Sequence, residues 1–307
     1  MRVLAHVHTF NDADVIDRTI EALLRQTRPP DGILVVDNAS SDCTIEQPSL
    51  KNATVVRHPE NQGTSGAVHT GFRFALEHDY DWIWVFDADS RPEPDALEKL
   101  LDLYAGWPRS LQDETGFLAC LHYNVRDGVP RHGRVFSRRS LSVVRPGPQE
   151  RYYRCHVNIW SGCLYCLTAV RQIGLPNADY VLDFGEGEYG YRVMKAGYKG
   201  FIHQDAVLQH NIRGYEARTP IEVNRGAATF TRYEFLPIRC YYTCRNSVYF
   251  TLYELAEGRP WHFARAVFGV TVRTLNCMRR PRNHGEQIVA CFRGLWHGVT
   301  GNIAARY

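Results

Sequence analysis

The sequence predicts an α/β protein built on a mostly parallel sheet of the Rossmann type. In the first third of the chain, short apolar runs alternate with segments whose apolar residues recur at helical spacing. The apolar runs are continuous rather than alternating, which is typical of strands buried on both faces of a parallel sheet. Strands separated by helices favour right-handed crossovers, and these crossovers make successive strands parallel.

The elements of this first part follow from the same pattern. Gly32–Val36 reads GILVV and is a clear example of a buried strand. The remaining expected strands are Arg2–His8, Ala53–Arg57 and Trp82–Phe86. The expected helices between them, in which apolar residues gather on one side, are Asp14–Gln26, Thr64–His78 and Pro94–Tyr104.

The middle of the chain, residues 105–215, is more mixed. Gly116–Tyr123 predicts another strand, and the basic and aromatic stretch Arg131–Arg154 predicts a hairpin or a mobile loop. A helix over Glu188–Ala196 should end at Gly197, because glycine suits the end of a helix. Two short strands are expected after it, Lys199–His203 and Ala206–His210.

The last part of the chain is predicted to be helical. Apolar and aromatic residues recur at helical spacing in Tyr241–Leu255, Trp261–Met278 and Gly285–Val299. We therefore expect a sheet domain over residues 1–215, with halves 1–104 and 105–215, followed by a helical region over residues 216–307.

Composition narrows the class of protein. No run of about 20 apolar residues exists, so we expect no membrane-spanning helix, and the N-terminus reads as a strand rather than as a signal peptide. The nine cysteines lie in apolar contexts and predict buried thiols of a cytoplasmic protein. Cys163 and Cys166 form a CxxC, but a zinc site would need a second such pair.

Positive charge is concentrated near the C-terminus. The net charge is only +3, yet eight arginines lie between Arg259 and Arg306 against one acidic residue, Glu286. This segment is either a solvated helical face or a surface for an anionic partner. The favoured partner is the inner face of the plasma membrane or a lipid-linked molecule rather than a nucleic acid. The mixture of aromatic, aliphatic and arginine residues suits helices at a membrane surface, and it equally suits a homodimer interface or a simple cap on the sheet domain.

Two carboxylates, Asp87 and Asp89, directly follow the strand Trp82–Phe86. Two such groups at one strand end repel each other, and a divalent cation with oxygen ligands would relieve this repulsion. Helix capping would explain one of the two aspartates better than both. An EF-hand is excluded because Pro92 stands where that loop needs glycine. The pair therefore predicts a site for Mg²⁺ or Mn²⁺.

Polar residues also follow the first two expected strands. Thr9, Phe10 and Asn11 come after the first strand, and Asp37 and Asn38 come after the second. Because ligands of such sheets bind beyond the carboxyl ends of the strands, we expect these residues and the aspartate pair to meet at one edge. Asp37 could accept hydrogen bonds from a nucleoside or simply cap a turn, and the stretch itself favours neither interpretation.

A fourth polar stretch, Asn61–Gly66, places glycines at the entrance of a helix, where backbone amides can face a phosphate or a sugar. The order of these motifs, VVDNASSD, NQGTSGA and FDADSRP after Thr9–Asn11, resembles the nucleotide-sugar half of the family 2 glycosyltransferases. These are inverting enzymes with the GT-A fold. The resemblance implies that Asp87 and Asp89 form a DxD motif. It also implies a group of nucleotide-sugar contacts, namely Thr9, Phe10, Asn11, Asp37, Asn38, Asn61, Gly63 and Asp87.

The second half of the chain extends the resemblance. LDFGEGEYGYRVMKAGY, residues 182–198, is similar to the stretch that carries the general base in the galactofuranosyl- and rhamnosyltransferase branch. The resemblance implies Glu186 as the base, with Asp183 and Glu188 as alternatives, and His210 as a metal ligand. The branch also implies sugar contacts, which here would be Trp160, Asp183, Glu188 and Arg245.

Together with these residues, the resemblance implies a metal-dependent inverting glycosyltransferase of cell-surface polysaccharide synthesis. The expected donor is a UDP- or dTDP-sugar, and the favoured transferred sugar is rhamnose or galactofuranose. The expected acceptor is a glycan, which could be attached to a lipid carrier. A sugar-1-phosphate nucleotidyltransferase would need a glycine-rich basic loop after the first strand, and HTFNDADV lacks one. A non-catalytic binder with the same fold would have no need of Asp87, Asp89, Glu186 and His210 together.

Overall fold

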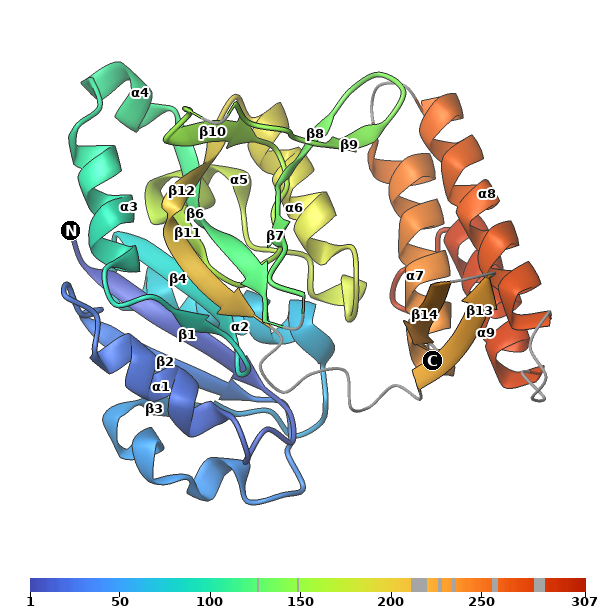
Figure 1. Cartoon of the computed structure of the whole chain (residues 1–307), viewed down its shortest axis with the longest axis horizontal. Helices are drawn as coiled ribbons and strands as arrows, with labels where there is room; N and C mark the ends of the chain where they lie inside the picture. Colours follow the sequence, from blue (N-terminus) through green and yellow to red (C-terminus); the bar gives the residue numbers. More distant parts are fainter. Residues whose placement is uncertain are drawn as a thin grey trace. The chain divides into compact units, whose positions relative to one another are not determined.

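The computed structural model describes residues 1–125, 127–147, 149–210, 220–225, 228–233, 236–255, 259–278 and 285–307 (Figure 1). The described residues form two compact units. The first unit consists of Met1–Phe136, Leu141–Val181 and Gly185–Arg213, and the second consists of Ser137–Ser140, Leu182–Phe184 and Gly214–Tyr307, in each case as far as these residues are described. The expected boundary between residues 215 and 216 lies outside the described residues.

A single 10-stranded sheet forms the centre of the first unit. Its main path runs in the order β10-β12-β6-β11-β4-β1-β2-β3, while β5 pairs with β12 and β7 pairs with β6. The strands are β1 (Val3–Thr9), β2 (Gly32–Asp37), β3 (Thr54–Arg57), β4 (Trp82–Asp87), β5 (Arg91–Pro92), β6 (Thr115–Asn124), β7 (Pro130–Arg131), β10 (Tyr152–Cys155), β11 (Cys163–Cys166) and β12 (Lys199–His210). A separate hairpin contains β8 (Arg134–Phe136) and β9 (Leu141–Val143).

The strand directions confirm the predicted α/β architecture. β4, β1, β2 and β3 are parallel neighbours, and β6 and β12 also pair in parallel. β11 lies between these two groups and is antiparallel to both β4 and β6. The two short strands expected over Lys199–His203 and Ala206–His210 are one strand, because β12 continues through an irregularity between His203 and Val207.

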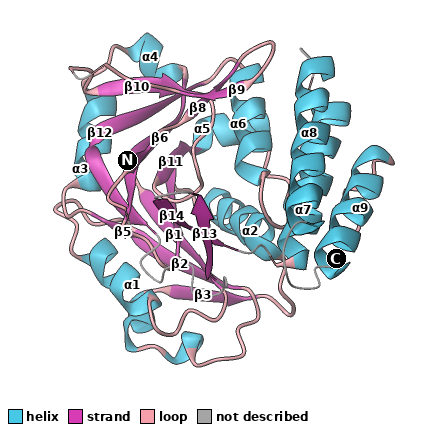
Figure 2. Ribbon diagram, turned by 45° about the vertical axis from the view of Figure 1, so that its right-hand side comes forward, coloured by secondary structure: helices cyan, strands magenta, loops and turns pink. Residues whose placement is uncertain are grey.

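Helices cover both faces of the sheet, α1 and α3 on one side and α2 and α6 on the other (Figure 2). The helices of this unit are α1 (Ile16–Leu24), α2 (Gly63–Glu77), α3 (Ala96–Ala105), α4 (Arg109–Asp113), α5 (Leu167–Ile173) and α6 (Gly185–Lys195). The predicted helices are confirmed with small shifts at their ends. The short α5 was not predicted from the sequence.

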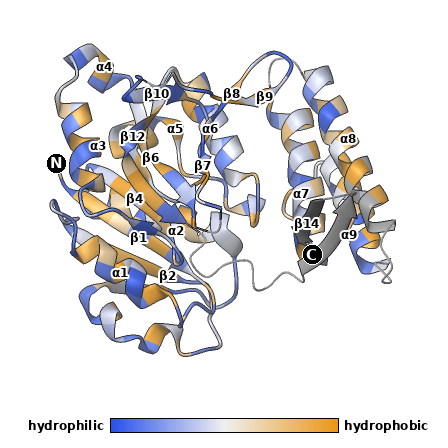
Figure 3. Ribbon diagram, in the orientation of Figure 1, coloured by the Kyte–Doolittle hydropathy of each residue, from blue (hydrophilic) through white to orange (hydrophobic). Residues whose placement is uncertain are grey.

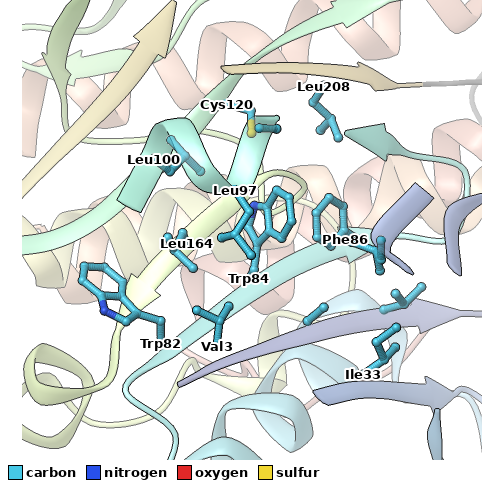
Figure 4. Close-up of a cluster of buried hydrophobic side chains, with 14 of the residues drawn as sticks. Val3, Ile33, Trp82, Trp84, Phe86, Leu97, Leu100, Cys120, Leu164 and Leu208 are labelled. Carbon is cyan, nitrogen blue, oxygen red and sulfur yellow. The ribbon is translucent and has the colours of Figure 1, made fainter. Parts of the chain in front are cut away.

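The two covered faces explain why the strands read as continuous apolar runs. In β4, Trp82, Trp84 and Phe86 belong to the core under α1 and α3 (Figure 4). The alternate residues Ile83 and Val85 belong to the core under α2, α5 and α6. Because successive side chains point to opposite faces, both sets must be apolar. In Figure 3, β2 and β6 are accordingly coloured mainly as hydrophobic.

The second unit contains the three predicted C-terminal helices and one hairpin that was not predicted. Its helices are α7 (Pro237–Tyr249), which continues as a π-helical turn over Phe250–Glu254, α8 (Arg259–Met278) and α9 (Gly285–Val299). Its strands are β13 (Pro220–Arg225) and β14 (Ala228–Tyr233). The expectation that this whole region is helical is therefore wrong for Pro220–Arg225 and Ala228–Tyr233, where β-branched and aromatic residues favour strands. No helix within the described residues has the length and apolar character that crossing a membrane requires.

Candidate active site

The two aspartates lie where the rigid strand β4 reaches the edge of the sheet. Asp87 is the last residue of β4, and Asp89 follows two positions later. The five residues before Asp87 are buried, so their packing fixes the direction in which the strand ends. The carboxylates remain partly accessible, with side-chain exposures of 33% for Asp87 and 21% for Asp89.

His210, the last residue of β12, lies beside the two aspartates although it is distant from them in sequence. The short strand β5, directly after the aspartates, pairs with β12, with Arg91 opposite Gln209. This pairing brings His210 Nε2 to 3.6 Å from Asp87 Oδ2, and His210 Nδ1 to 3.8 Å from Asp89 Oδ1. One ligand atom from each of the three residues lies within 4.8 Å of the others. Among the described residues, this is the group that could hold a metal ion.

Two buried serines hold the imidazole of His210 in place. Ser90 Oγ lies 2.6 Å from His210 Nδ1, and Ser161 Oγ donates to Ser90 Oγ at 2.8 Å. Ser161 Oγ also accepts a hydrogen bond from the backbone N–H of Asp87 at 3.2 Å. A neutral imidazole that donates from Nδ1 to Ser90 presents an unprotonated Nε2, which is the form that binds metal. We had not predicted a role for Ser90 from the sequence, although it directly follows the aspartate pair.

His8 is a second residue of this site that sequence reasoning missed. It lies on β1, opposite Asp87 in the parallel pairing with β4, and its Nε2 is 2.5 Å from Asp87 Oδ1. The ring is buried, with 8% of the side chain exposed. The signal in the sequence was a pair of histidines, His6 and His8, at alternate positions of an otherwise apolar strand. Both ring nitrogens of His6 lack a hydrogen-bond partner among the described residues.

The two carboxylates carry an electrostatic cost. Burial raises the pKa of Asp89 to about 6, His210 opposes this shift, and repulsion from Asp87 adds to it. Two carboxylates and one imidazole form a ligand set that suits Mg²⁺ or Mn²⁺. A divalent cation held by these residues would offset the repulsion, so the site fits the metal implied by the DxD resemblance.

The loops after β1 and β2 meet beside the aspartate pair, as the sequence predicted. Thr9 pairs with Asp37 in the strand register, while His8 pairs with Asp87. The amide oxygen of Asn11 accepts the backbone N–H of Ser41 at 2.8 Å. Phe10 exposes 43% of its surface at this edge. Thr9 is buried and donates from Oγ1 to Asp12 at 2.9 Å, so it contributes to the shape of the loop.

Asp37 and Asn38 are occupied by contacts within the protein. The carboxylate of Asp37 has no exposed surface, accepts the backbone N–H of Ser40 at 3.2 Å, and lies 3.3 Å from Arg57 Nε. Asn38 donates from Nδ2 to the carbonyl oxygen of Gly63 at 3.2 Å. Of the two interpretations of Asp37, this geometry corresponds to the capped turn. A nucleoside could reach the carboxylate only if Ser40 or Arg57 moved.

The residues at the start of α2 also make their contacts within the protein. Asn61 Oδ1 accepts the backbone N–H of Gly63 at 2.8 Å. Gly63 has φ of 72°, and a Cβ at this position would lie 2.3 Å from the carbonyl oxygen of Val181. The same carbonyl accepts the backbone N–H of Ser65 at 3.1 Å. Glycine is therefore required here because another segment packs against it at close range.

Trp160 and Arg245, two expected sugar contacts, are buried. Trp160 is 4% exposed and packs in an aromatic cluster with Phe72, Tyr165 and Tyr189. Arg245, on α7 of the second unit, has no exposed surface, and its guanidinium carbon lies 4.7 Å from the centre of the Tyr242 ring. Neither side chain offers surface to a sugar in this structure, and packing accounts for the position of each.

The three carboxylates around the start of α6 occupy different environments. Glu188 is 3% exposed and forms an ion pair with Arg192, with Nη2 to Oε2 at 3.1 Å. Burial raises the pKa of Glu188, and Arg192 opposes this shift. Asp183 belongs to the second unit, accepts a hydrogen bond from Thr243 Oγ1 at 2.9 Å, and lies 3.4 Å from Arg239 Nη1.

Glu186 differs from both because it lines a cavity of about 330 Å³ in the first unit. Residues from several elements form the wall of this cavity: His122, Pro130, Arg131, His132, Arg134, Val143, Val157, Asn158 and Ile159. A carboxylate on the wall of a cavity can approach a hydroxyl group bound in that cavity.

Comparisons with known proteins agree with this architecture. Residues 5–112 match the family described as Glycosyl transferase family 2. The galactofuranosyltransferase GlfT1 of Mycobacterium tuberculosis is 26% identical over 254 residues, which cover 80% of this chain and 81% of GlfT1. An undecaprenyl-phosphate mannosyltransferase of Micrococcus luteus is 36% identical over 110 residues, but the match covers only 44% of that protein.

Solved structures extend the likeness to the whole chain. The mannosyltransferase PcManGT of Pyrobaculum calidifontis, in complex with GDP-Man and Mn²⁺, has a TM-score of 0.54 at 16% identity, over 97% of this chain and 87% of that chain. S. aureus TarS 1–349, in complex with UDP-GlcNAc, has a TM-score of 0.57 at 13% identity, over 99% and 88%. The fold is thus that of the GT-A glycosyltransferases. Within the chain, residues 5–112 carry the glycosyltransferase family 2 match.

Proposed function

We propose that this protein is a metal-dependent inverting glycosyltransferase that moves rhamnose or galactofuranose from a UDP- or dTDP-sugar to a glycan acceptor. The observation that carries the proposal is the meeting of Asp87, Asp89 and His210 at the carboxyl end of the sheet, in a unit that also has Glu186 on a cavity wall. The similarity to GlfT1 over 80% of the chain favours the galactofuranosyl- and rhamnosyltransferase branch.

Asp87, Asp89 and His210 would stabilise the departing nucleoside diphosphate. A divalent cation bound by Asp87, Asp89 and His210, either Mn²⁺ or Mg²⁺, would supply positive charge for the departing nucleoside diphosphate. Ser90 and Ser161 keep the imidazole of His210 turned toward the aspartates. His8 holds one oxygen of Asp87 and leaves the other, Oδ2, on the side of His210.

The nucleoside would lie against the loops that follow β1, β2 and β3. Phe10 and Asn61 expose their side chains there, whereas Thr9, Asn11, Asp37, Asn38 and Gly63 shape the loops through internal hydrogen bonds and close packing. In this arrangement Asp37 does not contact the nucleotide. It holds the turn at Ser40 in the shape against which the nucleotide would bind.

The acceptor would enter the cavity beside Glu186. Inversion requires the acceptor hydroxyl to attack the anomeric carbon from the side opposite the diphosphate, and Glu186 takes the proton of that hydroxyl as the new bond forms. Glu188 and Asp183 are less suited to this role because each carboxylate is bound by a neighbouring cation. Their positions suggest that they support the segment that carries Glu186.

The cavity wall favours an acceptor with an acidic group. Arg131 is paired with Asp127, at 2.5 Å, but Arg134 has no acidic partner among the described residues. His122 and His132 add two more groups that can donate hydrogen bonds to an anion. The phosphate of a lipid-linked glycan would supply such a group, and this agrees with a role in cell-surface polysaccharide synthesis on the cytoplasmic side of the membrane.

A panel of nucleotide sugars with Mn²⁺ or Mg²⁺ tests the proposal. The expected result is a rise in melting temperature with a UDP- or dTDP-sugar, because a ligand at about 100 times its dissociation constant adds ~2.7 kcal/mol of stability. The same donor should release nucleoside diphosphate when acceptor is added. Stabilisation without any release would identify a non-catalytic binder instead, and no stabilisation by any donor would contradict the proposal.

A further inference from the structure

The helices α8 and α9 of the second unit each expose a row of large apolar side chains. The row on α8 consists of Trp261, Phe268, Val272 and Leu275, exposed by 54%, 69%, 38% and 41%. The row on α9 consists of Val289, Phe292, Trp296 and Val299, exposed by 63%, 56%, 66% and 43%. The spacings within each row are those of residues on one side of a helix, so we call the two rows the exposed stripes.

The opposite sides of the same helices are already used inside the unit. On α9, a Cβ at Gly294 would lie 2.4 Å from the carbonyl oxygen of Tyr241, and a Cβ at Gly298 would lie 2.7 Å from that of Arg245. On α8, Val270 is buried at 7% exposure. Both helices therefore already pack one side inside the unit, α9 through small residues and α8 through Val270 with His262 and Thr274.

Rows of large exposed apolar side chains are uncommon on a protein surface that is in contact only with solvent. Single exposed apolar residues are normal, whereas aligned sets that include two tryptophans and two phenylalanines indicate a contact surface. A helix whose apolar side is left exposed buries that side when it meets another surface. Neither α8 nor α9 is long and apolar enough to cross a bilayer, which leaves contact in the plane of the membrane surface.

The positive charges beside the exposed stripes favour membranes that contain anionic lipids. Arg265 on α8 and Arg293 on α9 are exposed, and neither has an acidic partner among the described residues. In the sequence, Arg259–Arg306 contains eight arginines and a single acidic residue, Glu286. Tryptophan and phenylalanine bordered by arginine are typical of helices that insert their apolar side between anionic lipid headgroups.

A second copy of the chain fits this surface less well. A two-fold interface places the same patch of both subunits face to face. The arginines of one copy would then approach those of the other, with almost no acidic residues in this segment to compensate. Anionic lipid instead provides the opposite charge, at ~1 kcal/mol for each arginine near the membrane surface, which corresponds to about fivefold in affinity.

We propose that the exposed stripes of α8 and α9 bind the surface of membranes that contain anionic lipids. Trp261, Phe268, Phe292 and Trp296 enter the boundary between headgroups and acyl chains, and Arg265 and Arg293 contact lipid phosphates. The interaction lies beyond the transfer reaction, because it needs neither donor nor acceptor. Its test can therefore fail while the proposed reaction stands, and the reverse.

Flotation of the full chain with lipid vesicles tests this interaction. Phosphatidylcholine vesicles that contain phosphatidylglycerol should bind the protein at least about tenfold more tightly than vesicles of phosphatidylcholine alone, and added salt should weaken the binding. The variant with Phe268→Glu and Trp296→Glu should bind at least about tenfold more weakly. The matched control is Leu24→Glu, an exposed apolar residue on α1, which should bind like the parent.

Two further measurements keep the result unambiguous. The melting temperature of each variant shows that it is folded, which is expected because the replaced side chains are mostly exposed. Light scattering reports the oligomeric state in the absence of vesicles. Equal binding to both kinds of vesicle, unchanged binding of the double variant, or a dimer that the double variant disrupts without any vesicle binding would each overturn the proposal.

Discussion

Two groups of carboxylates in this enzyme can be compared directly. Asp87 and Asp89 lie at the end of β4 with His210, two serines and His8 around them. The second group, at the start of α6, has three carboxylates within six residues of sequence, Asp183, Glu186 and Glu188. The first group converges on one point, whereas the members of the second group point to different partners.

The difference shows that the partners of a carboxylate decide its role. The first group brings two carboxylates together, so a cation can offset their repulsion. Burial is the main cause of the raised pKa of Asp89, about 6, and repulsion from Asp87 adds to it. In the second group, Arg192 satisfies Glu188 and Arg239 lies beside Asp183, while Glu186 lines a cavity. The first set is suited to binding a metal, and in the proposed function Glu186 of the second set takes the proton of the acceptor.

The largest expected effect is on the first group. Asp89→Asn should lower the rate of nucleoside diphosphate release by about a thousandfold or more, because it removes a charge that would hold the cation beside the leaving group. A chelator should lower the rate of the parent enzyme to the same level. The control is Asp102→Asn, an exposed aspartate on α3. If the rate of nucleoside diphosphate release is unchanged by a chelator, Asp87, Asp89 and His210 do not form a metal site, and the two groups of carboxylates no longer differ in metal binding.

The next effect separates the members of the second group. Glu186→Gln should lower transfer by about 10²–10⁴-fold, because glutamine cannot take the proton of the acceptor hydroxyl. Stabilisation by the donor and metal should remain, since Glu186 does not belong to the metal cluster. Initial rates and donor-induced melting shifts measured on the same preparation test both statements. A Glu186→Gln variant with the rate of the parent would exclude Glu186 as the base.

A smaller effect is expected at the serines that support His210. Ser90→Ala should weaken activation by Mn²⁺ by about 10–100-fold, with much of kcat recovered at saturating metal, because the imidazole loses the group that orients it. Rates measured across a series of metal concentrations separate the two parameters. The matched control is Ser49→Ala, since the buried hydroxyl of Ser49 has no hydrogen-bond partner among the described residues. A fall in kcat at unchanged metal requirement would argue against this positioning role.

The smallest expected effect on catalysis is at Glu188. Glu188→Gln should lower the free energy of unfolding by about 1–3 kcal/mol, because Arg192 loses a buried charged partner. The activity per folded molecule should stay close to that of the parent. Denaturant unfolding monitors the change, and Glu21→Gln serves as the control because its pair with Arg25 is exposed and should contribute less than about 1 kcal/mol. A stable but inactive Glu188→Gln variant would instead assign Glu188 to the chemistry.

Much of the fold could be predicted because it depends on local patterns. Apolar runs and helical periodicity located the strands from β1 to β4 and the helices between them, and the parallel order then placed the residues after β1, β2 and β4 at one edge. The hairpin of β13 and β14 and the short α5 were missed. The seven residues of α5 are too few for a helical period to be recognised. β13 and β14 are as long as β2 and β4, which were predicted, so their length does not explain why they were missed.

The sequence by itself determined the α/β class, the position of the aspartate pair at a strand end, and the three amphipathic helices near the C-terminus. These features follow from the spacing of apolar residues along the chain. Only the tertiary structure decided which side chains surround the aspartates, that Asp37, Trp160 and Arg245 are buried, and which of three nearby carboxylates lines a cavity. Burial and partnership arise when segments far apart in sequence pack together, as β5 and β12 do at His210, and no local pattern records that contact.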